Sequence, residues 1–197
     1  MLKSAELLVD SFDVLSIFFN PASAATGERV RCEPYKLLDK LAKIIETQGV
    51  RGPLGRVRIA LLGRSYRAYD VYDSIMVIPM TLLDNALKYS FGDSVNVTVT
   101  DEALGTRIEV TNVGPLIGDD EMDRIFERSG RGRFAERIQA KGAGVGLFVA
   151  AAAAKANGTK IEVRSVRKGY ERNGVPVADN AFSFVVRDSP GSGGKGA

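Results

Sequence analysis

The stretch KGAGVGLFVAAAAAKANGTKIEVRS, residues Lys141 to Ser165, decides the fold. Three glycines come directly before an alanine-rich run, which predicts a helix from Val145 to Asn157 that ends at Gly158. Glycines at a helix N-terminus offer free backbone N–H groups and the positive end of the helix dipole to a phosphate. A Walker A loop is excluded, because no lysine followed by serine or threonine comes after the last glycine. The spacing also excludes a dinucleotide fingerprint.

A second stretch, MTLLDNALKYS (Met80 to Ser90), lies within a predicted helix over residues 74–89. On a helix, Asn85, Lys88 and Tyr89 fall within about one turn, so their polar ends project close together. An amide oxygen can ligate Mg²⁺, an ammonium can meet a phosphate, and a tyrosine can cover a purine. Taken alone, the pattern fits an ordinary amphipathic helix with a solvated asparagine and lysine equally well.

A third stretch, VTNVGPLIGDDEMDRIFERSGRG (Val110 to Gly132), begins as a strand that runs into Gly114. A glycine there lets the backbone approach a ligand closely, although a glycine before a proline also marks a plain turn. Residues 119–126 are predicted to form a short helix with acidic residues at its start. Residues 129–142 are rich in glycine and arginine and are predicted to be mobile.

The rest of the chain alternates helical and extended patterns without an internal repeat. Further helices are predicted over 5–19 and 34–45, and strands over 29–32, 56–62, 68–72, 94–100, 107–112, 159–167 and 181–187. Several strands follow one another directly, which favours a two-layer α/β (α+β) sandwich with a mixed sheet over a doubly wound parallel sheet. We expect an N-terminal helix and linker over 1–26, one domain over 27–188, and a disordered tail over 189–197.

Composition narrows the possible partners and the compartment. Hydrophobic residues make up 45% of the 197 residues, which is enough for a packed core. The net charge of +3 comes from interspersed charges without a long basic run, so we expect no nucleic acid as partner. One cysteine, no apolar run long enough for a bilayer and no signal-peptide pattern indicate a cytoplasmic protein with no membrane contact by this segment.

Together, the three stretches resemble the ATP-binding domain of sensor histidine kinases, within the GHKL ATPase superfamily. LLDNALKYS resembles the N box, VTNVGPLI the G1 box, RIFERSGRG the F box, and GAGVGLFVAAAAAKANGTKIEV the G2 box with its helix and next strand. Four motifs in the right order are specific, and the resemblance spans about Val30 to Arg187. It implies the Bergerat fold, in which helices cover one face of a mixed, mostly antiparallel sheet and ATP lies under a mobile lid.

The resemblance also implies Mg-ATP as the ligand and gives roles to matching residues. Asn85 would ligate Mg²⁺, Lys88 would contact phosphate and Tyr89 would flank the nucleotide. The lid would run from about Glu127 to Lys141. The other implied nucleotide contacts are Asn112, Gly114, Ile117, Arg131, Arg133, Gly142, Gly144, Val145, Gly146 and Leu147.

Three positions depart from the family pattern. Asn112 stands where the family has an aspartate that accepts a hydrogen bond from the adenine amino group. A charge-assisted bond is worth roughly 1.5–3 kcal/mol against about 1 for a neutral one, so binding about tenfold weaker is expected. Leu116 replaces a glycine. Thr81 stands where the family has a carboxamide or carboxylate, so no catalytic residue is assigned, and Asp84 is interpreted as solvated helix surface.

The sequence contains no histidine, so a phosphoacceptor histidine must lie outside it. The leading hypothesis is a catalytic domain that transfers the γ-phosphate of ATP to such a histidine in two-component signalling. Its partners would be a histidine-bearing dimerisation domain or phosphotransfer protein, and a response regulator. The alternatives are a degenerate nucleotide-binding or partner-docking module without kinase activity and an anti-sigma-factor-type serine kinase. The helix over 5–19 fits either a truncated dimerisation hairpin or a native helix packed on the sandwich.

Overall fold

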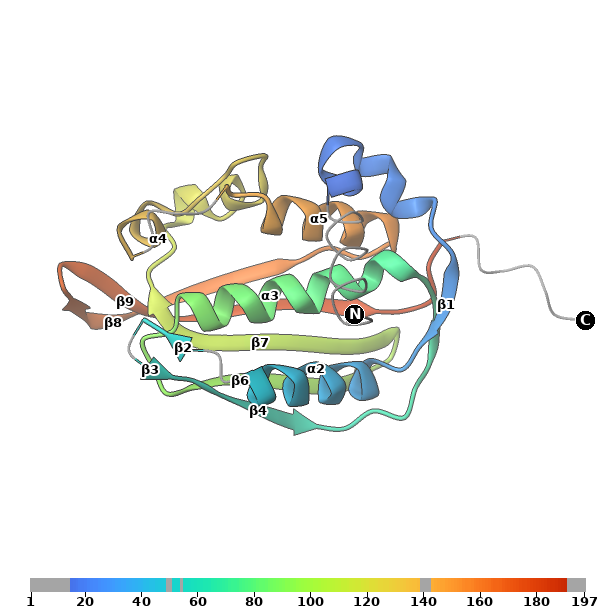
Figure 1. Ribbon diagram of the computed structural model, residues 1–197, viewed down its shortest axis with the longest axis horizontal. Coiled ribbons are helices and arrows are strands. Elements are labelled where there is room, and N and C mark those ends of the chain that lie inside the picture. Colours follow the sequence, from blue (N-terminus) through green and yellow to red (C-terminus); the bar gives the residue numbers. More distant parts are fainter. Residues whose placement is uncertain (1–14, 49–50, 54, 139–142, 191–197) are drawn as a thin grey trace, which may run out of the picture.

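The protein is described here by a computed structural model, which covers residues 15–48, 51–53, 55–138 and 143–190. A five-stranded sheet forms one layer (Figure 1), and its strands lie in the order β4-β6-β7-β9-β8. The parallel pair β4–β6 is followed by antiparallel pairs only. The strands are β4 (Arg58–Gly63), β6 (Ser94–Glu102), β7 (Gly105–Pro115), β9 (Val175–Val186) and β8 (Glu162–Arg172). The predicted α/β sandwich with a mixed, mostly antiparallel sheet is therefore confirmed.

Helices form the second layer, on one face of the sheet (Figure 1). They are α2 (Pro34–Gln48), α3 (Val77–Lys88) and α5 (Gly146–Ala156). All three contribute buried or half-buried apolar side chains to the main core, with α3 in the middle. Two small antiparallel sheets flank this sandwich, β1 (Arg29–Cys32) with β5 (Tyr69–Tyr72), and β2 (Arg51–Gly52) with β3 (Gly55–Arg56).

The core follows the two-residue period of the central strands. On β6 the residues Val95, Val97 and Val99 are buried, and on β7 the residues Ile108 and Val110 continue the same face. They pack with the buried side of α3, which consists of Ile78, Leu82, Leu83, Ala86 and Leu87. The apolar row of β7 then ends in a polar residue, Asn112, on the same face.

Several predicted element boundaries are wrong. The predicted helix over 119–126 is two 3₁₀ turns, η3 (Asp119–Glu121) and η4 (Arg124–Phe126), and the side chain of Glu121 accepts a hydrogen bond from the N–H of Gly118. The segment predicted to be mobile contains the helix α4 (Arg133–Ile138).

The helix α3 begins later than predicted, after the 3₁₀ turn η2 (Asp73–Met76). Pro79 lies in its first turn, where the missing N–H would have no helical partner. Met76 and Met80 are exposed, whereas Leu83 and Leu87 are buried.

Both ends of the described chain pack against α5. Residues 15–19 are helical and are followed by η1 (Pro21–Ala25), and Ile17 is buried with Val149 of α5. Residues 5–14 of the predicted helix lie outside the described residues. Ser189, predicted to start a disordered tail, is buried, and its hydroxyl donates to Asn157 at 2.7 Å. Ser189 therefore belongs to the packed part of the chain, and residues 191–197 of the predicted tail lie outside the described residues.

Among the helices of the described residues, none combines the length and the apolar character needed to cross a membrane.

Candidate functional site

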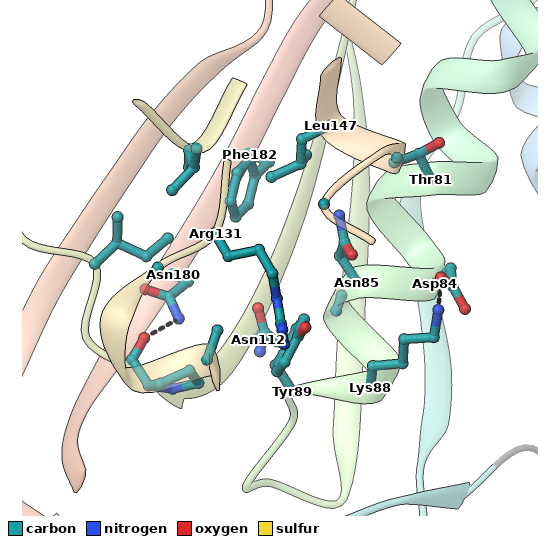
Figure 2. Close-up of a pocket in the computed structure, with 18 of the residues that line it drawn as sticks. Thr81, Asp84, Asn85, Lys88, Tyr89, Asn112, Arg131, Leu147, Asn180 and Phe182 are labelled. Atoms are coloured by element: carbon teal, nitrogen blue, oxygen red, sulfur yellow. Dashed lines mark hydrogen bonds and ion pairs between the residues drawn. The ribbon is translucent and has the colours of Figure 1, made fainter. Parts of the chain in front are cut away.

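A pocket of about 330 Å³ lies between α3, the start of α5 and the strands β7 and β9. Figure 2 shows side chains from these elements pointing into one space. Most of the residues predicted from the sequence line this pocket, although they are spread over some 65 positions. They are Thr81, Asn85, Lys88, Tyr89, Asn112, Ile117, Arg131, Gly144, Val145, Gly146 and Leu147.

One face of α3 forms a polar wall of the pocket. Thr81, Asn85 and Lys88 follow one another at helical spacing, so they lie in a row along the helix. Within the described residues, the side chain of Asn85 forms no hydrogen bond, whereas Lys88 makes an ion pair with Asp84. Asp84 was interpreted as solvated helix surface, but it also lines the pocket.

The floor of the pocket contains two asparagines that are directly opposite each other in the β7–β9 ladder, Asn112 and Asn180. The side chain of Asn180 is bonded at both ends, because its Nδ2 donates to the carbonyl of Pro115 at 3.0 Å and its Oδ1 accepts from Ser165 Oγ at 2.6 Å. Asn112 is only 8% exposed, and its side chain has no hydrogen-bond partner among the described residues. Its carboxamide is therefore open to a ligand.

Gly114 does not line the pocket, and its role differs from the predicted one. A Cβ at this position would lie 2.7 Å from the carbonyl oxygen of Tyr89 and 2.8 Å from Nδ2 of Asn112. The glycine is therefore needed because the end of α3 packs closely on β7. This contact brings Tyr89 and Asn112 together at the same end of the pocket.

The loop before α5 is equally tight. Gly144 has φ +64°, a conformation that side chains rarely adopt, and a Cβ there would lie 2.6 Å from the carbonyl carbon of Ser129. Val145 is the N-cap of α5 and makes no side-chain capping bond. The first N–H groups of α5 are therefore uncapped by side chains, and Gly146 and Leu147 line the pocket, which favours an anion there. Gly142, also predicted here, lies outside the described residues.

The two predicted arginines of the lid take different positions. Arg131 lines the pocket, and its side chain points inward in Figure 2. Arg133 does not line it, because its guanidinium forms ion pairs with Asp120 and with Glu121, at 3.4 Å in the second case. The structure therefore does not bring Arg133 to the other predicted residues.

Glu121 anchors the segment between Gly118 and Arg133. Its side chain is fully buried and accepts hydrogen bonds from the backbone N–H groups of Gly118, at 3.0 Å, and Arg133, at 2.7 Å. Burial alone would raise the pKa of Glu121, but these two bonds and the charge of the Arg133 guanidinium lower it overall. Glu121 is therefore a buried carboxylate that holds the start of α4 against the loop after β7.

The contribution of β9 to the pocket was not predicted from the sequence. Asn180 and Phe182 line the pocket from the strand opposite Asn112 and Val110. The sequence does contain a sign of this contribution. In the alternating run A-x-N-x-F-x-F, from Ala178 to Phe184, an asparagine stands at a position where the alternation predicts an apolar residue. The remaining unpredicted lining residues are Ala86, Pro115, Ile125, Gly132, Ala135 and Ala143.

Comparisons with known proteins agree with this geometry. The sequence pattern of the family described as histidine kinase-, DNA gyrase B- and HSP90-like ATPase matches residues 71–192. Histidine protein kinase SaeS of Staphylococcus aureus (strain USA300) is 34% identical over 172 residues, which cover 83% of this chain and 49% of that protein. SaeS of strain MRSA252 is 33% identical over the same length. The chain thus spans about half the length of the curated relatives it matches.

Solved structures of histidine kinases have the same fold. The catalytic domain of ThkA superposes with a TM-score of 0.59 at 16% identity, covering 82% of this chain and 97% of that chain. The mycobacterial sensor histidine kinase MprB gives 0.55 at 18% identity, covering 82% and 98%. Full-length ShkA in complex with AMPPNP gives 0.56 at 20% identity, covering 95% and 40%. The chain therefore belongs to the histidine kinase-, DNA gyrase B- and HSP90-like ATPase family, as an ATP-binding domain of the sensor histidine kinase type.

Proposed function

We propose that the pocket binds Mg-ATP and that the domain transfers the γ-phosphate to a histidine outside this sequence, in two-component signalling. One observation carries the proposal. The unbonded carboxamide of Asn85, the ammonium of Lys88 and the uncapped start of α5 face the same pocket. These are a metal ligand, a cation and an anion site, which is the set that a metal-bound polyphosphate requires.

The donor set fits Mg²⁺ that arrives with a nucleotide. The described residues contain no group of three His, Cys, Asp or Glu side chains that could hold a metal. Mg²⁺ usually keeps several waters and binds through one or two protein ligands plus substrate phosphates. The carboxamide oxygen of Asn85 would be that ligand. When bound, the metal would neutralise negative charge on the phosphates.

The phosphates would lie between α3 and α5. The N–H groups at the start of α5, after Gly144, would bind phosphate oxygens. Lys88 would exchange its ion pair with Asp84 for one with a phosphate, which costs little because both side chains are about half exposed. Arg131 would contact the outermost phosphate from the lid side.

The purine would occupy the end formed by β7 and β9. Half-buried apolar side chains line this part together with Asn112 and Asn180, and of these two amides that of Asn112 is unbonded among the described residues. Tyr89 would flank the nucleotide, and Ile117, Leu147 and Phe182 would contact the ring. Specificity would then depend on one buried carboxamide.

Transfer would depend on positioning and electrostatics, which dominate phosphoryl transfer. The threonine hydroxyl of Thr81 is not a base near neutral pH, so no general base is assigned. The phosphoacceptor would be supplied by a histidine-bearing dimerisation domain or phosphotransfer protein, followed by a response regulator. A domain that uses ATP in this way would work in the cytoplasm.

A second candidate is a degenerate nucleotide-binding or partner-docking module without kinase activity. The observations that favour it are Thr81 and Asn112, which replace the polar groups that the family uses at these positions.

Calorimetric titration with a non-hydrolysable ATP analogue, with and without Mg²⁺, tests the binding step. We expect Mg²⁺-dependent binding in the micromolar to millimolar range. A radiolabelled γ-phosphate transfer assay with a separately purified histidine-bearing dimerisation domain tests the transfer step. Binding without transfer would favour the degenerate module, and absence of both heat and thermal shift at saturating nucleotide would exclude the proposal.

A further inference from the structure

We propose that the pocket also accepts 6-oxopurine nucleotides, those of inosine or guanosine, through the carboxamide of Asn112. The inference rests on the proposed function in one respect, since it assumes that a purine nucleotide occupies the pocket. It adds a substrate class and names Asn112 as the residue that determines it.

The burial and the missing hydrogen bonds of the Asn112 side chain point to a ligand contact. Asn112 follows Thr106, Ile108 and Val110 on the core-facing side of β7, where the hydroxyl of Thr106 is hydrogen-bonded to Tyr69 and Asp101. Asn112 is 8% exposed and has no protein hydrogen-bond partner in the described part of the chain. Within the described residues, Nη1 of Arg29 is the one buried side-chain polar atom without a hydrogen-bond partner, so the unbonded amide of Asn112 is not sealed from solvent. A carboxamide in this position, on the wall of a pocket, is available for hydrogen bonds to a ligand.

The neighbouring amide of Asn180 is not free to rotate. Both ends of the Asn180 carboxamide are already bonded, to Pro115 and Ser165. Asn180 is thus fixed in one orientation. No such bond restrains the side chain of Asn112, so its amide plane can rotate to present either its oxygen or its nitrogen.

The two classes of purine differ in the donors and acceptors at the edge that Asn112 would contact. A 6-aminopurine presents a donor at N6 and an acceptor at N1, whereas a 6-oxopurine presents an acceptor at O6 and a donor at N1. The two patterns are reversed, and rotation of a carboxamide by about 180° exchanges its donor and acceptor. At the 6-position a carboxylate pairs with an amino group and repels O6, because a carboxylate only accepts. Asn112 can therefore bond the 6-substituent of both purine classes, whereas an aspartate in contact with that substituent would bond only the 6-amino class.

The test is calorimetric titration of the wild-type chain and Asn112→Asp with Mg-ATP, Mg-ITP and Mg-GTP. ITP lacks the 2-amino group, so it isolates recognition of the 6-position from the fit of the larger guanine. We expect the wild type to bind ITP within about tenfold of ATP, and Asn112→Asp to raise the preference for ATP over ITP by at least about tenfold. Asn96→Asp, at an exposed position of β6, is the matched control and should leave the ratio unchanged.

The outcomes separate this inference from the proposed function. If no nucleotide binds, the proposed function fails. If the wild type binds ATP but binds both ITP and GTP more than about a hundredfold more weakly, the proposed function stands and the inference is overturned. An unchanged ATP-to-ITP ratio in a folded Asn112→Asp chain would likewise overturn the role of Asn112. Binding of ITP without GTP supports the inference and restricts it to 6-oxopurines without the 2-amino group. Thermal unfolding of each variant shows whether it is folded.

Discussion

The carboxylate of Glu121 accepts a hydrogen bond from the backbone N–H of Arg133 at 2.7 Å, across twelve residues of sequence. The same carboxylate accepts from the N–H of Gly118. One buried side chain thus joins the loop after β7 to the start of α4, on either side of η3 and η4. The approach of Arg131 to the pocket therefore depends on a group that does not itself line the pocket.

Glu121→Gln is expected to destabilise the fold. The variant keeps the shape but replaces a charged acceptor of two backbone N–H groups by an amide whose nitrogen cannot accept. Hydrogen bonds to charged groups are worth roughly 1.5–3 kcal/mol, so a loss of about that size is expected in urea unfolding. Glu136→Gln, at an exposed position of α4, is the control and should change stability by less than about 0.5 kcal/mol. Equal effects of the two substitutions would contradict the anchoring role.

The same carboxylate predicts how stability depends on pH. Its pKa is lowered in the folded state from the ordinary value of 4.5. Glu121 therefore contributes stability that is fully present above pH 4.5 and is lost as the pH falls through the lower folded pKa. Asp101, bonded to Thr106, has its pKa lowered too, so both groups contribute to the acid limb of the wild type. Glu121→Gln should flatten this limb without abolishing it in a series of unfolding curves from pH 6 to 3.

Gly144→Ala is expected to lose both stability and nucleotide binding. The alanine would have to adopt φ +64°, which costs roughly 1–2 kcal/mol, and its Cβ would overlap the backbone of Ser129. Gly132→Ala is the matched control, because Gly132 also lines the pocket but its Cβ would meet only the Cβ of Ala135, at 3.9 Å. The melting temperature of each variant measures its stability, and calorimetric titration measures its nucleotide binding. Wild-type binding by Gly144→Ala would mean that the loop is not constrained by its contact with Ser129.

Asn85→Ala is expected to lose Mg²⁺-dependent nucleotide binding while the fold survives. The side chain of Asn85 is half-buried at the pocket and bonds no other described residue, so its removal leaves no buried group unpaired. Asn96→Ala, on the exposed side of β6, controls for the loss of an asparagine. If Asn85→Ala binds Mg-ATP as tightly as the wild type, the metal assignment is wrong.

The lid segment is expected to gain order when nucleotide binds. No residue of α4 is buried, so little apolar contact holds it in place beyond its anchored start at Arg133. A triphosphate would neutralise the basic residues of this segment and couple binding to ordering. Hydrogen exchange of residues 127–138 should slow with Mg-ATP and much less with adenosine. Equal exchange in both states would show an ordinary surface loop.

Periodic patterns were enough to predict the sheet centre and the pocket helices. The alternation of Val95, Val97 and Val99 and the glycines before α5 are local signals, and the structure has a strand and a helix at these places. The prediction failed where a residue acts through a distant partner. Glu121 looks like an ordinary acid at the start of a helix, and only its contact with Arg133 reveals it as a buried anchor.

The part of the pocket formed by β9 was not predicted, because the local sequence there is not typical of a strand. Pro176 argues against a strand, and Asp179 and Asn180 are typical of turns, so the strand was predicted only from residue 181. In the structure these residues continue β9, because Pro176 pairs with β8, Val177 pairs with β7, and Ala178 to Asn180 pair with both. Pairing over this long range overrides local preference, and no short window of sequence contains that information.

The β7–β9 ladder also has a consequence for how the chain folds. Its last pair, Pro115 with Val177, closes the whole intervening stretch into one loop, which contains the lid, α5 and β8. Closing such a loop costs entropy before any contact offsets it, so a sheet centred on this pair has a high contact order and folds slowly. The pocket floor forms only when Asn112 and Asn180 meet in that closure. Assembly of the site and global folding are therefore a single cooperative event, and a nascent chain holds no binding site until β9 has been made.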